Sequence, residues 1–126
     1  MSNNDNDTIS KMIKYCIDSA KYTSGMEFEE FNNNELYLTF SVFALSQLGE
    51  LVSRLSEEIK AEYDEIPWNA IKSIRNRIVH DYEGVQYRII WDTIKDDIPE
   101  LIKEFEIIGN TLNRIDLEDE DEINEN

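Results

Sequence analysis

Apolar residues recur at three- and four-residue steps along most of this 126-residue chain, and no stretch of any length alternates like a β-strand. The spacing is clear near the N-terminus at Ile9, Met12, Ile13 and Cys16, and again later at Leu101, Phe105, Ile108 and Leu112. A repeat close to 3.6 residues is that of an amphipathic helix. The sequence therefore predicts an all-α, up-and-down bundle of four or five helices.

Four helical segments are expected, at about residues 7–24, 34–63, 66–82 and 85–112. Gly25 suits the end of the first because glycine tolerates a positive φ. Pro67 suits a first helical turn, and Pro99 predicts a kink or a restart. Residues 7–114 form one predicted domain. Residues 1–6 and the acidic tail at 115–126 carry too little apolar surface to fold and are expected to be disordered.

The second segment carries more apolar side chains than one helical stripe holds. One interpretation assigns one face to the core of the chain and the other to the interface of a homodimer, with Gly49 permitting close helix approach. The alternative is that the whole surplus is internal core, because a small bundle can surround its longest helix.

The charge balance restricts the possible partners. There are 28 acidic and 12 basic residues, a net charge of −16, which argues against broad adhesion to DNA or to an anionic membrane. No apolar run approaches membrane-spanning length and the N-terminus lacks a signal-peptide pattern, so a soluble, cytoplasmic protein without a membrane partner is expected. Cys16 is the only cysteine and is expected in the core.

One local window reverses this balance. Between Pro67 and Ile90 four cations face two acids: Lys72, Arg75, Arg77 and Arg88 against Asp81 and Glu83. Residues 66–82 (IPWNAIKSIRNRIVHDY) also contain the only histidine, His80. A small cationic site of this kind can hold a phosphate without gripping long nucleic acid unaided.

The polar residues of this helix do not all share one face. Arg75 falls roughly 40° from Ile71, beside the apolar stripe, and a guanidinium there must find partners or a ligand. Arg75 and His80 are roughly 140° apart, whereas Asn76 and His80 share a face. A two-fold dimer can bring Arg75 of one chain near His80 of the other.

An arginine and a histidine without a second cluster of metal ligands fit metal-independent cleavage of RNA. Histidine titrates near neutral pH and can take a proton from the ribose 2′-hydroxyl or give one to the leaving oxygen. Arginine can hold the phosphate and meet the charge that develops in the transition state. Asn76 is a supporting candidate that can orient the phosphate or the imidazole. Neither a cofactor nor a metal is expected.

Residues 66–82 resemble the signature of the HepT-like branch of the HEPN superfamily, the toxin halves of MntA–HepT toxin–antitoxin modules. The likeness extends from about Ile9 to Leu112. It includes the Phe31 region, residues 48–50 (LGE) where the family usually has Ile-Gly-Glu, Trp91, and residues 98–101 (IPEL), similar to the family's Leu-Pro-Glu-Leu. The resemblance implies a HEPN bundle that dimerises through its motif helices and forms a composite site in the interface cleft.

The same resemblance implies a toxin of a type VII-like module, a metal-independent endoribonuclease that acts on cellular transfer RNA or messenger RNA. By motif match Arg75 and His80 are catalytic and Asn76 is the polar residue after the arginine. Tyr82 matches the tyrosine that an MntA-like nucleotidyltransferase antitoxin modifies with AMP from ATP. A bulky anion beside His80 would occupy the phosphate subsite and repel substrate.

Two other interpretations remain open. The chain is alternatively a non-catalytic HEPN dimer that binds a nucleotidyltransferase or a nucleotide, or a structural helical dimer without a ligand. Tyr82 is then an aromatic residue flanking the core. Independently of the function, the acidic tail is expected to be a solvated segment, with mimicry of phosphate towards the cationic patch as the less favoured alternative.

Overall fold

A computed structural model describes residues 3–80 and 87–125, with side chains for 4–77 and 87–118. Its elements are α1 (Asn3–Tyr22), α2 (Phe28–Asn32), α3 (Glu35–Val52), α4 (Glu57–Glu62), α5 (Trp68–His80), α6 (Tyr87–Asp92), the π-helical segment η1 (Thr93–Asp97) and α7 (Ile98–Glu125). No strand occurs within these two ranges. The predicted all-α fold is confirmed.

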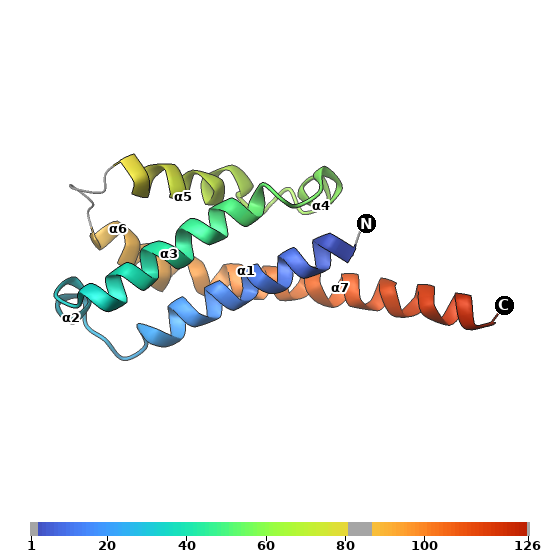
Figure 1. Ribbon diagram of the computed structural model, residues 1–126, viewed down its shortest axis with the longest axis horizontal. Helices are drawn as coiled ribbons and strands as arrows, with labels where there is room; N and C mark the ends of the chain where they lie inside the picture. The colour runs from blue at the N-terminus through green and yellow to red at the C-terminus, as the bar shows by residue number, and fades with distance from the viewer. Residues whose placement is uncertain (1–2, 81–86, 126) are drawn as a thin grey trace.

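The long helices lie side by side in the order α5, α3, α1, α7 (Figure 1). Their contact faces hold the apolar residues of the predicted stripes, and the largest fully buried ones include Ile9, Met12, Leu45, Leu48, Phe105 and Ile108. Removal of this apolar surface from water is the main stabilising contribution. Among the described helices, none is both long and apolar enough to cross a membrane.

Cys16 is in the core, as predicted. Its side chain is 1% exposed, and burial raises the pKa of its thiol to about 12 because the thiolate is disfavoured away from water. The thiol is therefore uncharged at neutral pH and packs as a small apolar group.

The predicted single helix at 34–63 is wrong, because α3 ends at Val52 and α4 begins at Glu57. Ser56 caps α4 by accepting a hydrogen bond from the Ile59 N–H at 3.3 Å. Asp5 fixes this turn from α1: its Oδ1 accepts from the Ser56 N–H at 3.0 Å, and its Oδ2 accepts from the Ser56 hydroxyl at 2.7 Å. The break thus depends on a partner 51 residues away in the sequence.

Both ends of the chain are helical further out than expected. Helix α1 begins at Asn3 and not near residue 7, and Asp5, expected in a disordered segment, is 2% exposed. Helix α7 continues to Glu125 and extends beyond the other helices (Figure 1), although 115–126 were expected to be disordered. No glycine or proline follows Gly109, and glutamate favours helices, so nothing in the local sequence stops α7 earlier.

The helix end predicted at Gly25 and the helix interruption predicted at Pro99 are confirmed. Gly25 has a φ of 79° after α1. Pro99 has no N–H to donate, and the α-helical pattern is replaced by η1 just before it. The connection at 27–34 folds back onto the core: Phe31 is fully buried, and its ring centroid lies 5.2 Å from that of Trp91.

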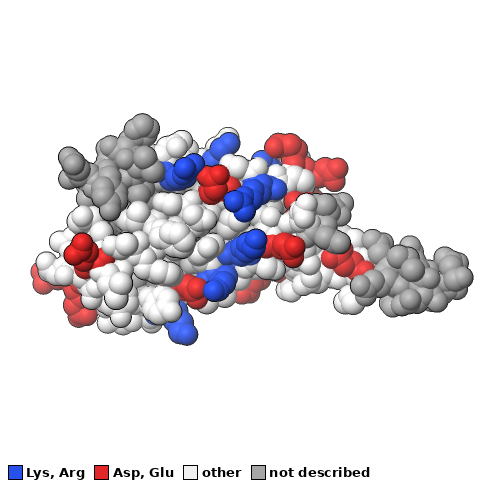
Figure 2. Space-filling model, in the orientation of Figure 1, with Lys and Arg blue, Asp and Glu red and all other residues white. Residues whose placement is uncertain are grey.

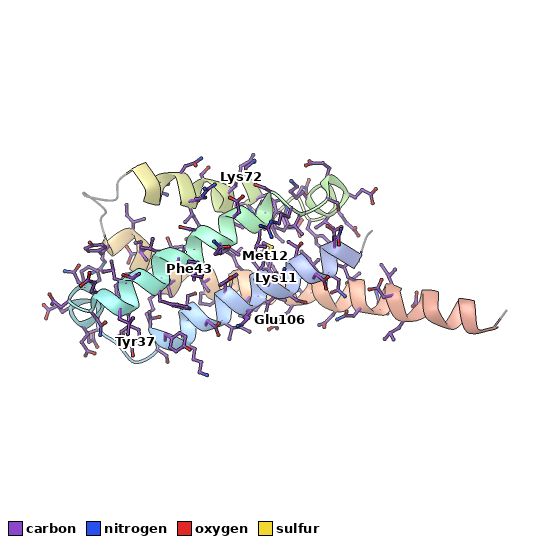
Figure 3. All side chains as sticks on the ribbon, viewed as in Figure 1. Lys11, Met12, Tyr37, Phe43, Lys72 and Glu106 are labelled. Carbon is purple, nitrogen blue, oxygen red and sulfur yellow. The ribbon has the colours of Figure 1, made fainter. Side chains whose placement is uncertain are left out.

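Helix α3 uses most of its apolar side chains inside the chain. Gly49 serves an internal contact with α5, where a Cβ would lie 3.1 Å from the carbonyl oxygen of Ile71. Leu36 and Phe43 nevertheless remain 76% and 50% exposed. Phe43 lies on the α1 side of α3, and its ring packs against Tyr15 (Figure 3). The internal-core interpretation therefore explains most of the surplus, and the homodimer remains a prediction.

Candidate functional site

Helix α5 carries the candidate site, and its start is anchored to the preceding turn. The indole N–H of Trp68 donates to the carbonyl oxygen of Tyr63 at 3.0 Å. The carbonyl of Pro67 accepts from the Ile71 N–H at 3.0 Å, so Pro67 precedes the helix and its missing N–H costs nothing. Ile71 is buried as predicted. These contacts fix the face that α5 turns towards α3.

Arg75 pairs with Glu50 of α3. Its Nη1 lies 2.8 Å from Glu50 Oε2, and the two side chains are 54% and 42% exposed. The preceding residue, Gly49, lets the helices approach: a Cβ there would lie 3.4 Å from the Cβ of Arg75. The close α3–α5 contact therefore places the Glu50 carboxylate beside the guanidinium.

The expectation that Arg75 must find a partner or a ligand is answered by Glu50, although Arg75 is exposed and does not lie in a low-dielectric core. A guanidinium has five N–H donors in a fixed plane. One bond to Glu50 restrains its orientation and leaves donors for a phosphate. Asn76 is exposed next to it on α5.

The other two candidates lie at the edge of the described chain. His80 is the last residue of α5, and its side chain is outside the described side chains. Tyr82 lies outside the described residues. Because α5 is α-helical from Trp68 to His80, the backbone positions of Arg75 and His80 are about 140° apart around its axis.

Glu50 is the residue that sequence reasoning missed. It was noted as part of residues 48–50 (LGE) but was given no role. The sequence signal for its role is that Glu50 directly follows Gly49. Glycine permits the close helix contact that a short ion pair requires. What could not be read from the sequence is that α3 and α5 meet at this register.

A groove of about 430 Å³ lies on another side of α5, between this helix and η1 and α7. Its apolar lining residues are Pro67, Ala70, Ile71, Ile74 and Leu101, and its polar rim consists of Arg77, Thr93, Asp96, Asp97, Glu100 and Glu104. Trp68 of α5 stacks on Phe105 of α7, with ring centroids 6.0 Å apart. The groove is therefore an open apolar channel with a mainly acidic edge.

Glu104 differs from the other acids of this rim in having a buried carboxylate oxygen, Oε2, without a hydrogen-bond partner among the described residues. Burial raises the pKa of its carboxyl, and the nearby charges of Glu100 and Glu65 raise it further. Arg77 and Asp97 line the same groove. The folded state thus binds a proton at Glu104 more readily than the unfolded chain does.

Replacing Glu104 with glutamine should raise the melting temperature at pH 7. A raised pKa in the folded state means that stability is lost as the pH rises through it, and glutamine removes that loss. The gain should shrink as the pH falls below the unfolded-state pKa of about 4.3, because the carboxyl then becomes protonated in both states. Thermal melts of Glu104→Gln at several pH values measure this. The control is Glu106→Gln, an exposed position on the same helix (Figure 3); equal gains for both variants would contradict the prediction.

The fold and the site together define a class of all-α bundle proteins. One helix of the bundle ends in histidine and carries an exposed arginine, which pairs with a carboxylate of the neighbouring helix. The sequence pattern of the family described as "Ribonuclease HepT-like" matches residues 12–118. The chain belongs to this HepT-like family, as the resemblance predicted.

Individual relatives agree with this assignment. A putative RNase of Methanocaldococcus jannaschii is 37% identical over 97 residues, covering 77% of this chain and 80% of the relative. A second putative RNase of that organism is 35% identical, covering 80% of this chain and 87% of the relative. The probable ribonuclease HepT of Thermococcus cleftensis is 33% identical, covering 68% and 78% respectively. No solved structure matches the chain.

Proposed function

We propose that this protein is an endoribonuclease that cleaves RNA without a metal ion, with Arg75 and His80 as its catalytic residues. Membership of the HepT-like family and the printed names of the relatives support the activity. The observation that carries the assignment to α5 is the exposed Arg75, restrained by Glu50 at 2.8 Å on the helix that ends at His80.

The proposed reaction is attack of a ribose 2′-hydroxyl on the adjacent phosphate. The imidazole of His80 takes the proton of the attacking hydroxyl or supplies one to the leaving oxygen, the roles of a general base and a general acid. Arg75 donates to the phosphate oxygens, whose charge increases in the transition state. Asn76 orients the phosphate or the imidazole. Glu50 holds the guanidinium so that less freedom is lost when RNA binds.

The proposed site is composite, with Arg75 of one subunit facing His80 of the other. The separation of about 140° on one helix supports this arrangement. Sedimentation velocity of the wild-type protein tests the dimer, and a monomer at assay concentrations would contradict the composite site.

Incubation of purified protein with transfer RNA in excess chelator tests the activity. Wild type should cleave the RNA, and His80→Ala should lose cleavage by about 10²- to 10⁴-fold, the usual contribution of general acid–base catalysis. Intact RNA with both proteins would reject the nuclease and favour a non-catalytic, partner-binding dimer. Cleavage that disappears with chelator would reject the metal-independent mechanism.

We further propose that the protein is the toxin of a toxin–antitoxin module, silenced when a nucleotidyltransferase transfers AMP from ATP to Tyr82. Tyr82 follows His80 by two residues in the sequence. The phosphate of an added AMP would therefore compete with the RNA phosphate for the site and repel the RNA backbone. Intact-mass measurement after incubation with ATP and an MntA-like nucleotidyltransferase should show added AMP on wild type. The same mass gain on Tyr82→Phe would show that another residue is modified.

A further inference from the structure

The groove between α5, η1 and α7 is lined by neither Arg75 nor Asn76. Ile74 and Ile71 line it, and Arg75 lies roughly 40° beyond Ile71 around the axis of α5. Helix α5 packs on α3 on its other side. A molecule in the groove would therefore contact the helix that carries the candidate residues while leaving Arg75 accessible.

The charge of the groove's rim indicates which kind of molecule can bind there. Its rim presents the carboxylates of Asp96, Asp97, Glu100 and Glu104 against the single guanidinium of Arg77. In the described part of the chain, the ion pairs found involve none of these four acids. An RNA backbone would be repelled by this rim. A second copy of the chain would bring few cations to this rim, because it has 12 basic and 28 acidic residues.

Among the described residues, no group of three or more histidine, cysteine, aspartate or glutamate side chains is arranged to hold a metal ion. The floor of the groove is apolar, formed by Ala70, Ile74 and Leu101 among others, and the groove's volume of about 430 Å³ is enough to take several side chains. The matching chemistry is an apolar ridge flanked by cations.

We propose that this groove docks a basic amphipathic segment of another protein, with apolar side chains against the floor and lysine or arginine side chains on the acidic rim. An amphipathic helix presents such a ridge at positions i, i+4 and i+7. Docking opposes the crowded carboxylates of Glu100 and Glu104 with positive charge. It also clamps α5 to α7 beyond the stacking contact of Trp68 with Phe105. The binding itself does not depend on ribonuclease activity.

The probe is a fluorescein-labelled, 14-residue peptide of leucine and lysine arranged at helical spacing, titrated by fluorescence anisotropy against the full-length protein. It should bind saturably, and a peptide of the same composition with the helical spacing scrambled should bind at least about fivefold more weakly. Glu100→Gln combined with Glu104→Gln should weaken binding about tenfold, since two attractive contacts are lost. Neutralising these crowded acids is not expected to unfold the protein.

The matched control removes the same charge elsewhere. Glu29→Gln with Glu30→Gln, both exposed on α2, should change the affinity less than twofold. As a separate test, Ala70→Arg places a cation at an exposed position of the groove floor. This variant should bind the peptide more weakly than wild type does. Equal losses for the α2 and rim variants would overturn the proposal, because attraction would then follow net charge alone.

Two further measurements locate the occupant. In ¹⁵N-labelled protein, peptide-induced shift changes should centre on the groove residues Ala70, Ile74 and Thr93; changes centred on Leu36 and Phe43 would overturn the assignment. If the rim variant instead alters the sedimentation coefficient of the protein without peptide, the groove is an interface between copies of this chain and the proposed partner is wrong.

Discussion

Replacing Arg75 with alanine should reduce RNA cleavage by about 10²- to 10³-fold, the loss typical when a donor to a developing oxyanion is removed. The melting temperature should change by little, because the ion pair with Glu50 joins side chains that are 54% and 42% exposed, and such pairs contribute about 0–1 kcal/mol. Single-turnover cleavage of a defined RNA, measured beside a thermal melt, separates these two effects.

Arg114→Ala provides the matched control, since it removes the same charge from an exposed position on α7. It should cleave RNA within about twofold of wild type. Glu50→Ala should fall between the two variants, because it frees the guanidinium without removing it. Arg75→Ala at wild-type rate would contradict the catalytic assignment. A loss equal to that of Arg114→Ala would show that Arg75 contributes only general positive charge.

A composite site adds a constraint to this experiment. If each site pairs Arg75 of one subunit with His80 of the other, a mixed dimer of Arg75→Ala and His80→Ala chains contains one site with both residues intact. Mixtures should therefore recover activity up to a fraction set by the proportion of mixed dimers. Subunit exchange must be shown by mass measurement first, after which a lack of recovery contradicts the composite arrangement.

Local apolar periodicity was sufficient to predict the helices and most of the core. Ile71, Phe105 and Leu112 are buried where the spacing placed them, and Gly25 ends the turn after α1 with a positive φ. These features depend on neighbours within one or two helical turns, so the sequence records them directly. The motif helix was found for the same reason, and its start is displaced by only a residue or two.

Features that depend on contacts between distant segments were not predicted. The break between α3 and α4 is held by Asp5, and the partner of Arg75 is Glu50, 25 residues earlier. Both carboxylates look like ordinary surface acids in the sequence. The groove beside α5 likewise results from how far η1 and α7 stand from that helix, which periodicity does not encode.

The second large expected effect is a loss of stability when the core between α1 and α7 is altered. Replacing Ile108 with alanine should destabilise the protein by about 2–5 kcal/mol, because Ile108 is fully buried and its removal leaves a cavity in a close-packed interior. The next residue, Gly109, lies against α1, where its Cβ would be 3.6 Å from Ile9 Cγ2, so α7 has little freedom to close the gap. Chemical denaturation measures the loss as a lower midpoint at an unchanged slope.

Ile107→Ala is the paired control, with the same substitution one position earlier on the same helix. Ile107 is 59% exposed, so the change in free energy of unfolding should stay within about 0.5 kcal/mol. Equal and small effects would mean that the α1–α7 contact contributes little to stability. A large effect at Ile107 that grows on dilution would instead show that this exposed side chain is buried between subunits, because the stability of an oligomer depends on protein concentration.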